Sequence, residues 1–217
     1  QGEILKTAAV RKIALDPDDS VKFKVIFENP DFIIIDKPAG LVVHPTATTP
    51  EKTLVNGLLS YWPQLAKIGE DPLRPGIVHR LDKEVSGLMV VAKSAGSFEH
   101  LKKQFKERRV KKEYLALVYG RVSRDEGVID FNIKRSQRNP LRWVATPQKT
   151  GRRAVTLFEV VKQFVNYAFL KIEIKTGRTH QIRVHLKAIG HSVVGDQLYK
   201  IKKYKEKVKT HLHPRKP

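Results

Sequence analysis

The sequence predicts an α+β fold with a mixed, mostly antiparallel central sheet and flanking helices. Segments typical of strands outnumber segments typical of helices, and the two kinds do not alternate strictly, which disfavours a doubly wound parallel sheet. The chain has 217 residues, of which 41% are hydrophobic and 29% charged. This length and composition are those of a soluble globular protein that buries a sizeable core.

The N-terminal part of the chain divides into an arm and the start of a domain. Residues 1–20 mix charged side chains with turn-forming ones, and we expect a linker or N-terminal arm ahead of a domain at 21–217. The alternating segment Val21–Phe27 and the apolar segment Phe32–Asp36 flank an Asn-Pro-Asp turn. This pattern predicts a β-hairpin.

Three segments have helical spacing of apolar residues. The first follows Thr49 and Pro50, which predict the N-terminus of a helix that Pro63 ends. The second follows Ser94, a predicted N-cap, and the third is the segment Thr179–Ile189. The apolar stripe of the second helix consists of Phe98, Leu101 and Phe105.

The remaining apolar segments predict strands. Leu88–Lys93 is a buried-strand candidate, and Tyr114–Gly120 is another. Ala154–Val161 and Tyr167–Ile174 predict a long hairpin, because apolar and charged side chains alternate in its second arm. The basic segment 132–153 is expected to form loops and short strands.

The charge of the chain points to a polyanionic partner. There are 42 basic and 22 acidic residues, a net charge of +20, which favours nucleic acid first and an anionic membrane surface second. No apolar run approaches the roughly 20 residues of a membrane span, and no segment has the order of a signal peptide. The chain has no cysteine, which excludes disulfides, thiolate catalysis and cysteine-ligated zinc. An intracellular, cytoplasmic location is the default expectation.

The segment GIVHRLDKEVSG, residues 76–87, places Asp82 between Arg80 and Lys83. An aspartate in a basic loop is usually only a salt-bridge partner. This loop, however, is bounded by glycines and precedes an apolar strand, so it leaves a rigid scaffold, where catalytic residues often lie. The basic neighbours would keep the carboxylate ionised, which suits a nucleophile or a group that stabilises positive charge.

Other chemistries have weaker support. His180 and His185 are five residues apart, which on a helix turns them about 140° from each other and disfavours zinc ligation. The chain has neither a GxxxxGK[ST] phosphate loop nor a GxSxG nucleophile elbow. A two-metal nuclease stays open only if the fold gathers scattered acids, namely Asp36, Asp82, Glu84 and Asp196.

Four motifs carry a resemblance to a known family. HRLDKEVSGLMVVAK (79–93) resembles the signature motif of the RluA/RluD family of pseudouridine synthases. DKPAGLVVHP (36–45), RVKKEYLALVYG (109–120) and KTGRTHQIRVHLKAIGHSVVGDQLY (175–199) resemble further motifs of that family in the same order. The resemblance implies isomerisation of uridine to pseudouridine in RNA without metal, cofactor or nucleotide. It favours the RluD-like branch and large-subunit ribosomal RNA, with transfer RNA as the second candidate, and we expect a monomer without a membrane partner.

The resemblance also implies roles for single residues. Asp82 matches the essential aspartate, which attacks C1′, stabilises an oxocarbenium-like species or takes a ribose proton. Arg183 matches the arginine that pairs with this aspartate. Tyr114 matches a tyrosine that stacks on the base and is a candidate for deprotonation at C5. Arg80 matches the arginine that fills the space of the flipped-out nucleotide, and Ile182 is expected to pack behind the pocket.

Two further groups of residues are predicted to contact RNA. We expect the substrate site to include His79, Leu81, Lys175, Arg178 and His180. We expect contacts to the RNA backbone from the basic residues Lys102, Lys103, Lys106, Arg108, Arg109, Arg135, Arg138 and Arg152. A charge run is often only a solvated face.

The chain departs from the family pattern in three ways. Val85 stands where the family commonly has Thr or Ser. No S4-type RNA-binding domain precedes residue 21, although ribosomal-RNA members of the family usually carry one, and the sequence leaves open whether one lies upstream of this chain. The family continues into a closing strand where this chain stops, so we expect an incomplete sheet or a missing segment near 200–217. The main alternative function is a non-catalytic RNA-binding or ribosome-assembly protein, which would lack Asp82, Tyr114 or Arg183.

Overall fold

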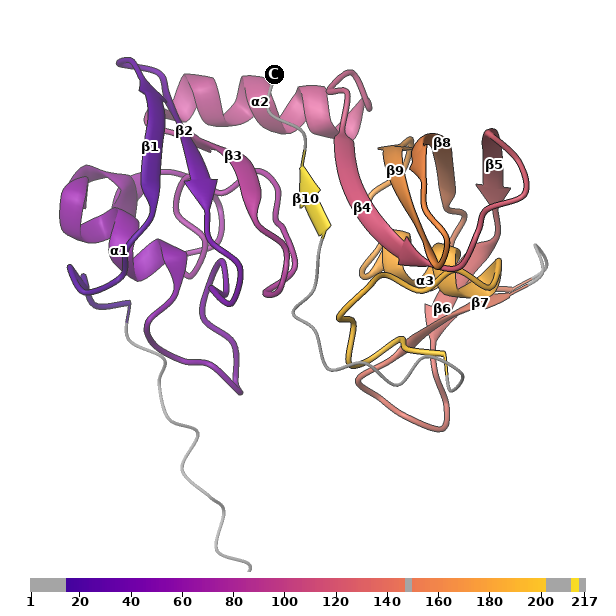
Figure 1. Cartoon of the computed structure of the whole chain (residues 1–217). Coiled ribbons are helices and arrows are strands. Elements are labelled where there is room, and N and C mark those ends of the chain that lie inside the picture. Colours follow the sequence, from indigo (N-terminus) through magenta and orange to yellow (C-terminus); the bar gives the residue numbers. More distant parts are fainter. Residues whose placement is uncertain (1–14, 147–149, 202–211, 215–217) are drawn as a thin grey trace, which may run out of the picture.

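The computed structural model describes residues 15–146, 150–201 and 212–214. The strands in these ranges form three sheets, and every pairing within them is antiparallel. Figure 1 shows two of the sheets side by side, with helices on their outer faces and across the top. The predicted α+β class is therefore confirmed, with the strands divided among three sheets.

The N-terminal half of the molecule is a three-stranded sheet covered by a helix. Its strands, in spatial order, are β1 (Lys24–Glu28), β2 (Phe32–Lys37) and β3 (Gly87–Ala92). The predicted hairpin is confirmed, since β1 and β2 pair antiparallel. Ile33, Ile35 and Val91 are fully buried, because alternate residues of β2 and β3 face the core.

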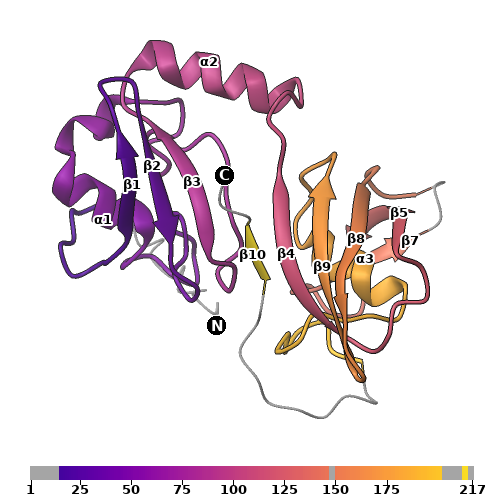
Figure 2. The ribbon, with the colours of Figure 1, turned by 45° about the horizontal axis from the view of Figure 1, so that its top comes forward.

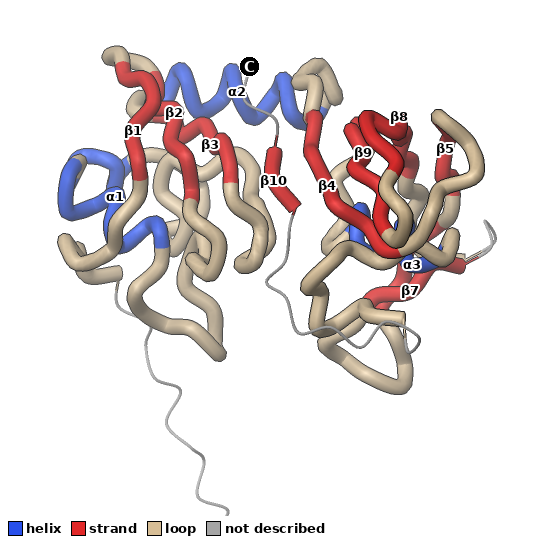
Figure 3. The backbone as a smooth tube through the Cα atoms, in the orientation of Figure 1, coloured by secondary structure: helices blue, strands red, loops and turns tan. Residues whose placement is uncertain are grey.

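Helix α1 (Leu54–Tyr61) begins later than the sequence predicts. Its N-cap is Thr53, because Oδ1 of Asn56 accepts hydrogen bonds from the backbone N–H and the hydroxyl of Thr53. Thr49 instead belongs to a tight turn, in which it exchanges backbone hydrogen bonds with Thr46. A 3-10 helix, η1 (Pro63–Lys67), follows α1, and Figure 3 shows that the chain from there to β3 is mainly loop.

Helix α2 (Ala95–Lys106) crosses the top of the molecule from the N-terminal sheet toward β4 (Figure 1). Ser94 is its N-cap, as predicted, and its hydroxyl oxygen accepts a hydrogen bond from the backbone N–H of Ser97. Phe98 is buried, while most of the basic side chains lie on the exposed face. The helix therefore leads from the first half of the fold to the second.

The C-terminal half is a five-stranded sheet. Its strands, in spatial order, are β10 (Leu212–Pro214), β4 (Glu113–Tyr119), β9 (Tyr167–Ile174), β8 (Val155–Gln163) and β5 (Glu126–Asp130). The predicted β8–β9 hairpin is confirmed. Leu170 and Ile172 are fully buried in one hydrophobic core that also includes Ile33 and Val91, so both halves share a core.

Helix α3 (Gln181–Ala188) and a small sheet pack against the five-stranded sheet. The small sheet joins β6 (Asn132–Arg135) to β7 (Trp143–Thr146). The helix begins two residues later than predicted, because His180 adopts a left-handed conformation with φ 55° and serves as its N-cap. The first turn of α3 lies near the N-terminal half, since Arg183 comes within 3.7 Å of Asp82.

Both ends of the described chain lie against the fold. Strand β10 pairs with β4 and lies between β4 and β3 in Figures 1 and 2. The sequence predicted an incomplete sheet or a missing segment near 200–217, but within that range β10 adds a strand to the edge of β4. At the other end, Asp16 and Asp18 exchange hydrogen bonds with Asn56 of α1, and residues 1–14 of the predicted arm lie outside the described residues. In the described ranges, no helix has the length and apolar character needed to cross a membrane.

Candidate active site

The loop that carries Asp82 is fixed on both sides. Leu81 and Val85 are buried beside it, at 5% and 3% exposure. The backbone N–H of Val85 donates to the carbonyl of Asp82, and the carbonyl of Lys83 accepts from the backbone N–H of Gly40. The carboxylate of Asp82 is therefore presented from a loop whose backbone is held in place.

Lys37, the last residue of β2, connects this strand to the Asp82 loop through a hydrogen bond to Lys83. Its buried ammonium donates to the carbonyls of Pro38 and Leu41 at 2.8 Å and to that of Lys83 at 3.2 Å. Burial lowers the pKa of Lys37 to about 8, and the charges of Asp82 and Glu84 partly oppose this. The DKPAG motif thus supports the Asp82 loop through backbone contacts.

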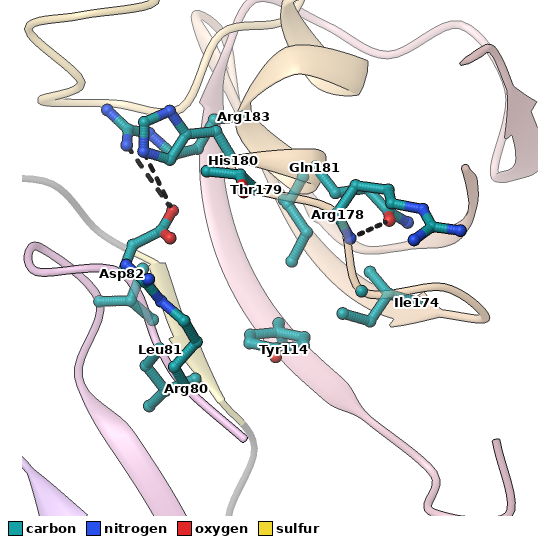
Figure 4. Close-up of a pocket in the computed structure, with 13 residues that line it drawn as sticks. Arg80, Leu81, Asp82, Tyr114, Ile174, Arg178, Thr179, His180, Gln181 and Arg183 are labelled. Carbon is teal, nitrogen blue, oxygen red and sulfur yellow. Dashed lines mark hydrogen bonds and ion pairs between the residues drawn. The ribbon is translucent and has the colours of Figure 1, made fainter. Parts of the chain in front are cut away.

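Arg183, the arginine of α3, faces Asp82 but is held mainly by another carboxylate. Its Nε and Nη2 donate to the two oxygens of Asp196 at 2.7 and 2.9 Å. Its Nη1 lies 3.7 Å from Oδ2 of Asp82, and the guanidinium stacks over the ring of Tyr199. The predicted contact between Arg183 and Asp82 is present as a long ion pair (Figure 4).

The sequence pointed to Asp196 only as one of the scattered acids of a nuclease, and its pairing with Arg183 was not predicted. Its side chain is fully buried, and Oδ1 also accepts hydrogen bonds from the backbone N–H groups of Leu198 and Tyr199. Burial by itself raises the pKa of Asp196, but the hydrogen bonds and charge of Arg183 outweigh burial and leave that pKa below its ordinary value. The usable signal was its place in the GDQLY stretch that closes the fourth motif.

His180 lies between Asp82 and Tyr199. Its Nε2 is 3.9 Å from Oδ2 of Asp82, and its Nδ1 is 2.7 Å from the hydroxyl of Tyr199. Burial lowers the pKa of His180, and the charge of Asp82 opposes this. The side chain of Gln181 fixes the preceding loop, since it accepts from the Thr176 hydroxyl and donates to the Val155 carbonyl. The imidazole is therefore held at the edge of the site as a neutral group.

Tyr114, at the start of β4, completes a cavity of about 130 Å³ with Asp82 on its opposite side (Figure 4). Burial raises the pKa of Tyr114 well above its ordinary value, and the nearby charge of Asp82 raises it further. The phenol is thus protonated at neutral pH. The lining residues are Arg80, Leu81, Asp82, Val85, Tyr114, Ile174, Gly177, Arg178, Thr179, His180, Gln181, Ile182 and Arg183.

Most of the predicted substrate residues line this cavity, but two do not. His79 accepts a hydrogen bond from the Val90 backbone N–H at Nε2, stacks on Phe105, and faces a neighbouring cavity. Burial lowers the pKa of His79 to about 4. Lys175 forms an ion pair with Glu173 and lines neither cavity, because alternation along β9 and the turn after it directs its side chain away.

The basic residues predicted to contact the RNA backbone fall into separate groups. Lys106 and Arg108 line the neighbouring cavity. Lys102 and Arg109 form ion pairs with glutamates, while Lys103 is exposed on α2. The others lie on or beside the small β6–β7 sheet and line neither cavity; they are Arg135, Arg138 and Arg152. Among the described residues, no group of three or more His, Cys, Asp or Glu side chains is placed to hold a metal ion.

Comparison with known proteins identifies the family to which the chain belongs. A family profile described as RNA pseudouridylate synthase matches residues 31–188. An uncharacterised RNA pseudouridine synthase of Aquifex aeolicus is 45% identical over 187 residues, covering 85% of this chain and 58% of that protein. The ribosomal large subunit pseudouridine synthase D of Nitrosomonas europaea is 44% identical over 181 residues, covering 83% of this chain and 51% of that protein.

A solved structure agrees with this assignment. Human RNA pseudouridylate synthase domain containing 1 matches with a TM-score of 0.75 and 25% sequence identity, over 92% of this chain and 79% of that one. The chain belongs to the RNA pseudouridylate synthase family. It spans little more than half the length of the curated relatives it matches.

Proposed function

We propose that this chain isomerises uridine to pseudouridine in structured RNA, with Asp82 as the catalytic residue. The observation that carries the proposal is the carboxylate of Asp82 in a cavity whose other walls hold Arg183, His180 and Tyr114. The net charge of +20 suits a polyanionic substrate. The membership of the chain in the family supports the same reaction.

The reaction rearranges bonds within one nucleotide. The bond from N1 of uracil to C1′ of ribose breaks, the uracil turns while it is held, and C5 bonds to C1′. The hydrogen of C5 then leaves as a proton, and N1 gains one, so composition and strand length are unchanged. Asp82 attacks C1′, stabilises positive charge there or takes a ribose proton. Each route uses a carboxylate in an ionised state, and the guanidinium of Arg183 places a positive charge 3.7 Å from Oδ2 of Asp82.

The target nucleotide has to leave its stack before Asp82 reaches its sugar. Flipping costs about a few kcal/mol and is cheapest in loops, which favours structured RNA with unpaired uridines. Arg80 lies beside the cavity, where it would fill the vacated space. The ring of Tyr114 offers a stacking surface for the uracil. A role for Tyr114 as the base at C5 would need a phenolate, which the site disfavours before substrate binds.

We further propose large-subunit ribosomal RNA as the substrate class. Relatives from Nitrosomonas europaea and Haemophilus ducreyi, 44% and 39% identical, are named ribosomal large subunit pseudouridine synthase D. Their names support ribosomal RNA over transfer RNA.

Tritium release tests the proposed function. RNA carrying [5-³H]uridine is incubated with the wild type and with Asp82→Asn in the presence of a chelator. We expect release by the wild type and a rate about 10²- to 10³-fold lower for the variant, because removing a key electrostatic group from an active site commonly costs that much. RNA binding should persist in Asp82→Asn, because a negatively charged carboxylate does not bind the RNA phosphates.

The outcomes separate the alternatives. Release by both proteins would remove Asp82 from its role. RNA binding without release by either protein, on ribosomal RNA fragments that contain flipped-out uridines, would favour a non-catalytic RNA-binding protein. Shortened RNA that a chelator protects would point to the metal-dependent nuclease instead.

A further inference from the structure

A second cavity of about 390 Å³ lies directly beside the Asp82 cavity. The two share part of their walls, which are formed by Arg80, Tyr114, Ile174, Gly177 and Arg178. The second cavity continues past these residues to the C-terminal end of α2 and the segment that leads into β4. The residues found there are Phe105, Lys106, Arg108 and Lys112.

The walls of the second cavity are strongly cationic. Five of its lining residues carry a positive charge, and no described residue in the lining is acidic; the five are Arg80, Lys106, Arg108, Lys112 and Arg178. Several like charges around one cavity repel each other, and such an arrangement is offset when an anion binds between them. The mechanism proposed above uses only Arg80 among these five.

The pairing of neighbouring cations separates this cluster from an ordinary charged surface. Lys102 pairs with Glu70, Arg109 with Glu107, and Lys111 with Glu113. In the part of the chain that the structure describes, no carboxylate lies within 4.0 Å of a charged nitrogen of Lys106, Arg108 or Lys112. Residues 102–112 thus contain some cations that form ion pairs with carboxylates and others that line the cavity.

The end of helix α2 does not account for the whole cluster. The carbonyls at a helix C-terminus stabilise cations within its last turn, which explains Lys106. Lys112 lies beyond the helix, just before β4, and is half-buried. Burial lowers the pKa of Lys112, and the charge of Arg108 lowers it further. Arg108 itself has φ 59°, a strained left-handed conformation for a side-chain-bearing residue.

We propose that the second cavity binds the phosphates of the RNA strand immediately next to the target uridine. Arg80 and Arg178 stand in the walls of both cavities, so a nucleotide in the first leaves its adjoining backbone at the second. Phosphate contacts of this kind fix the register of a strand without reading its bases. The inference rests on the proposed function in one respect, the placement of uridine in the Asp82 cavity.

The salt dependence of RNA binding tests the cavity directly. A fluorescein-labelled RNA stem–loop with one uridine in its loop is titrated by anisotropy at several KCl concentrations. Each phosphate contact contributes about 0.7 to 0.9 to the slope of log K against log salt. The variant Arg108→Gln/Lys112→Gln removes two such contacts and should therefore make the negative slope shallower by about 1.4 to 1.8.

The matched control removes two charges outside the cavity. Lys24 is exposed on β1, and Lys111 is exposed and paired with Glu113. The variant Lys24→Gln/Lys111→Gln should change the slope by less than half as much, because neither charge faces the cavity. Equal slopes for the two double variants would overturn the inference. Circular dichroism melts confirm that both variants are folded.

Neutral phosphates provide a second arm that uses the wild-type protein. Methylphosphonate linkages on the two sides of the uridine should weaken wild-type binding about tenfold or more, but should weaken Arg108→Gln/Lys112→Gln by less than threefold. The same penalty in both proteins would overturn the inference. So would inorganic phosphate that binds the cavity while methylphosphonate substitution has no effect, since the cavity would then bind free phosphate.

The two proposals fail separately. If the wild type releases no tritium but the slope contrast and the methylphosphonate contrast hold, the proposed reaction is wrong and the phosphate site stands. If the wild type releases tritium and both contrasts are absent, the phosphate site is wrong and the reaction stands.

Discussion

Asp196→Asn is the substitution for which the structure makes the strongest stability prediction. In the wild type the guanidinium of Arg183 is held by both oxygens of Asp196, and the two side chains are 8% and 0% exposed. Asparagine keeps one oxygen for the backbone N–H groups of Leu198 and Tyr199. Its amide nitrogen, however, faces Nε of Arg183, which places a donor against a donor.

The expected loss follows from burial. Removing one partner of a buried ion pair typically costs about 3 to 5 kcal/mol, because the other charge stays buried without compensation. With a urea m-value of about 3 kcal/mol/M for a chain of this size, the midpoint should fall by about 1 to 1.7 M. Asp82→Asn should cost less than about 1 kcal/mol, because Asp82 is 22% exposed and lies 3.7 Å from Arg183.

Urea unfolding followed by circular dichroism measures both effects. Asp71→Asn is the matched control, since Asp71 and Arg74 form an ion pair in which both side chains are about half exposed. At pH 7 we expect a large shift for Asp196→Asn and little shift for Asp71→Asn. The fold lowers the pKa of Asp196, so the advantage of the wild type over Asp196→Asn should shrink as the pH falls below the ordinary aspartate range. A wild-type midpoint for Asp196→Asn at pH 7 would refute the buried-pair reasoning.

Two further predictions concern the Asp82 loop and its support. Burial lowers the pKa of His79 from 6.5 to about 4, so the unfolded chain takes up a proton there first and stability falls as the pH drops from about 6.5 to 4. His79→Gln keeps an acceptor for Val90 and should flatten that fall in urea titrations; an unchanged pH profile would contradict it. Gly76 has φ +69° and a Cβ there would lie 2.6 Å from the carbonyl oxygen of Ala92, so Gly76→Ala should cost about 2 kcal/mol or more. Gly96→Ala, with open space around it in α2, should be neutral or stabilising by up to about 1 kcal/mol; similar melting shifts for both would refute the steric argument.

Local patterns predicted most of the fold. The alternation in Tyr167–Ile174 predicted the buried face of β9, and Ser94 predicted the start of α2. The start of α1 was predicted at the wrong threonine. Both Thr49 and Thr53 can cap a helix, and the choice is made by contacts of Asn56 with Thr53 and with Asp16, 40 residues away. Short sequence windows carry no signal for such contacts.

The sequence motifs were sufficient to predict the main residues of the candidate site. Asp82, Tyr114 and Arg183 lie around one cavity, as the family resemblance implied. The partner of Arg183 was missed, because Asp196 lies 13 residues further on and meets the guanidinium only after a turn. Lys175 was placed in the site because its neighbours in the motif are there, but an ion pair with Glu173 holds it elsewhere. Side-chain direction within a motif depends on turns that the motif letters do not specify.

The two large sheets meet along a seam where β10 lies between β3 and β4. Asp82 lies in the loop before β3, on one side of this seam, and Arg183 lies in α3, on the other side. Neither sheet alone sets the distance between the carboxylate and the guanidinium. Substitutions at positions along this seam that lie outside the cavity lining would therefore change the distance and angle between the carboxylate of Asp82 and the guanidinium of Arg183. A protein engineer could alter turnover there while leaving every group that touches RNA unchanged.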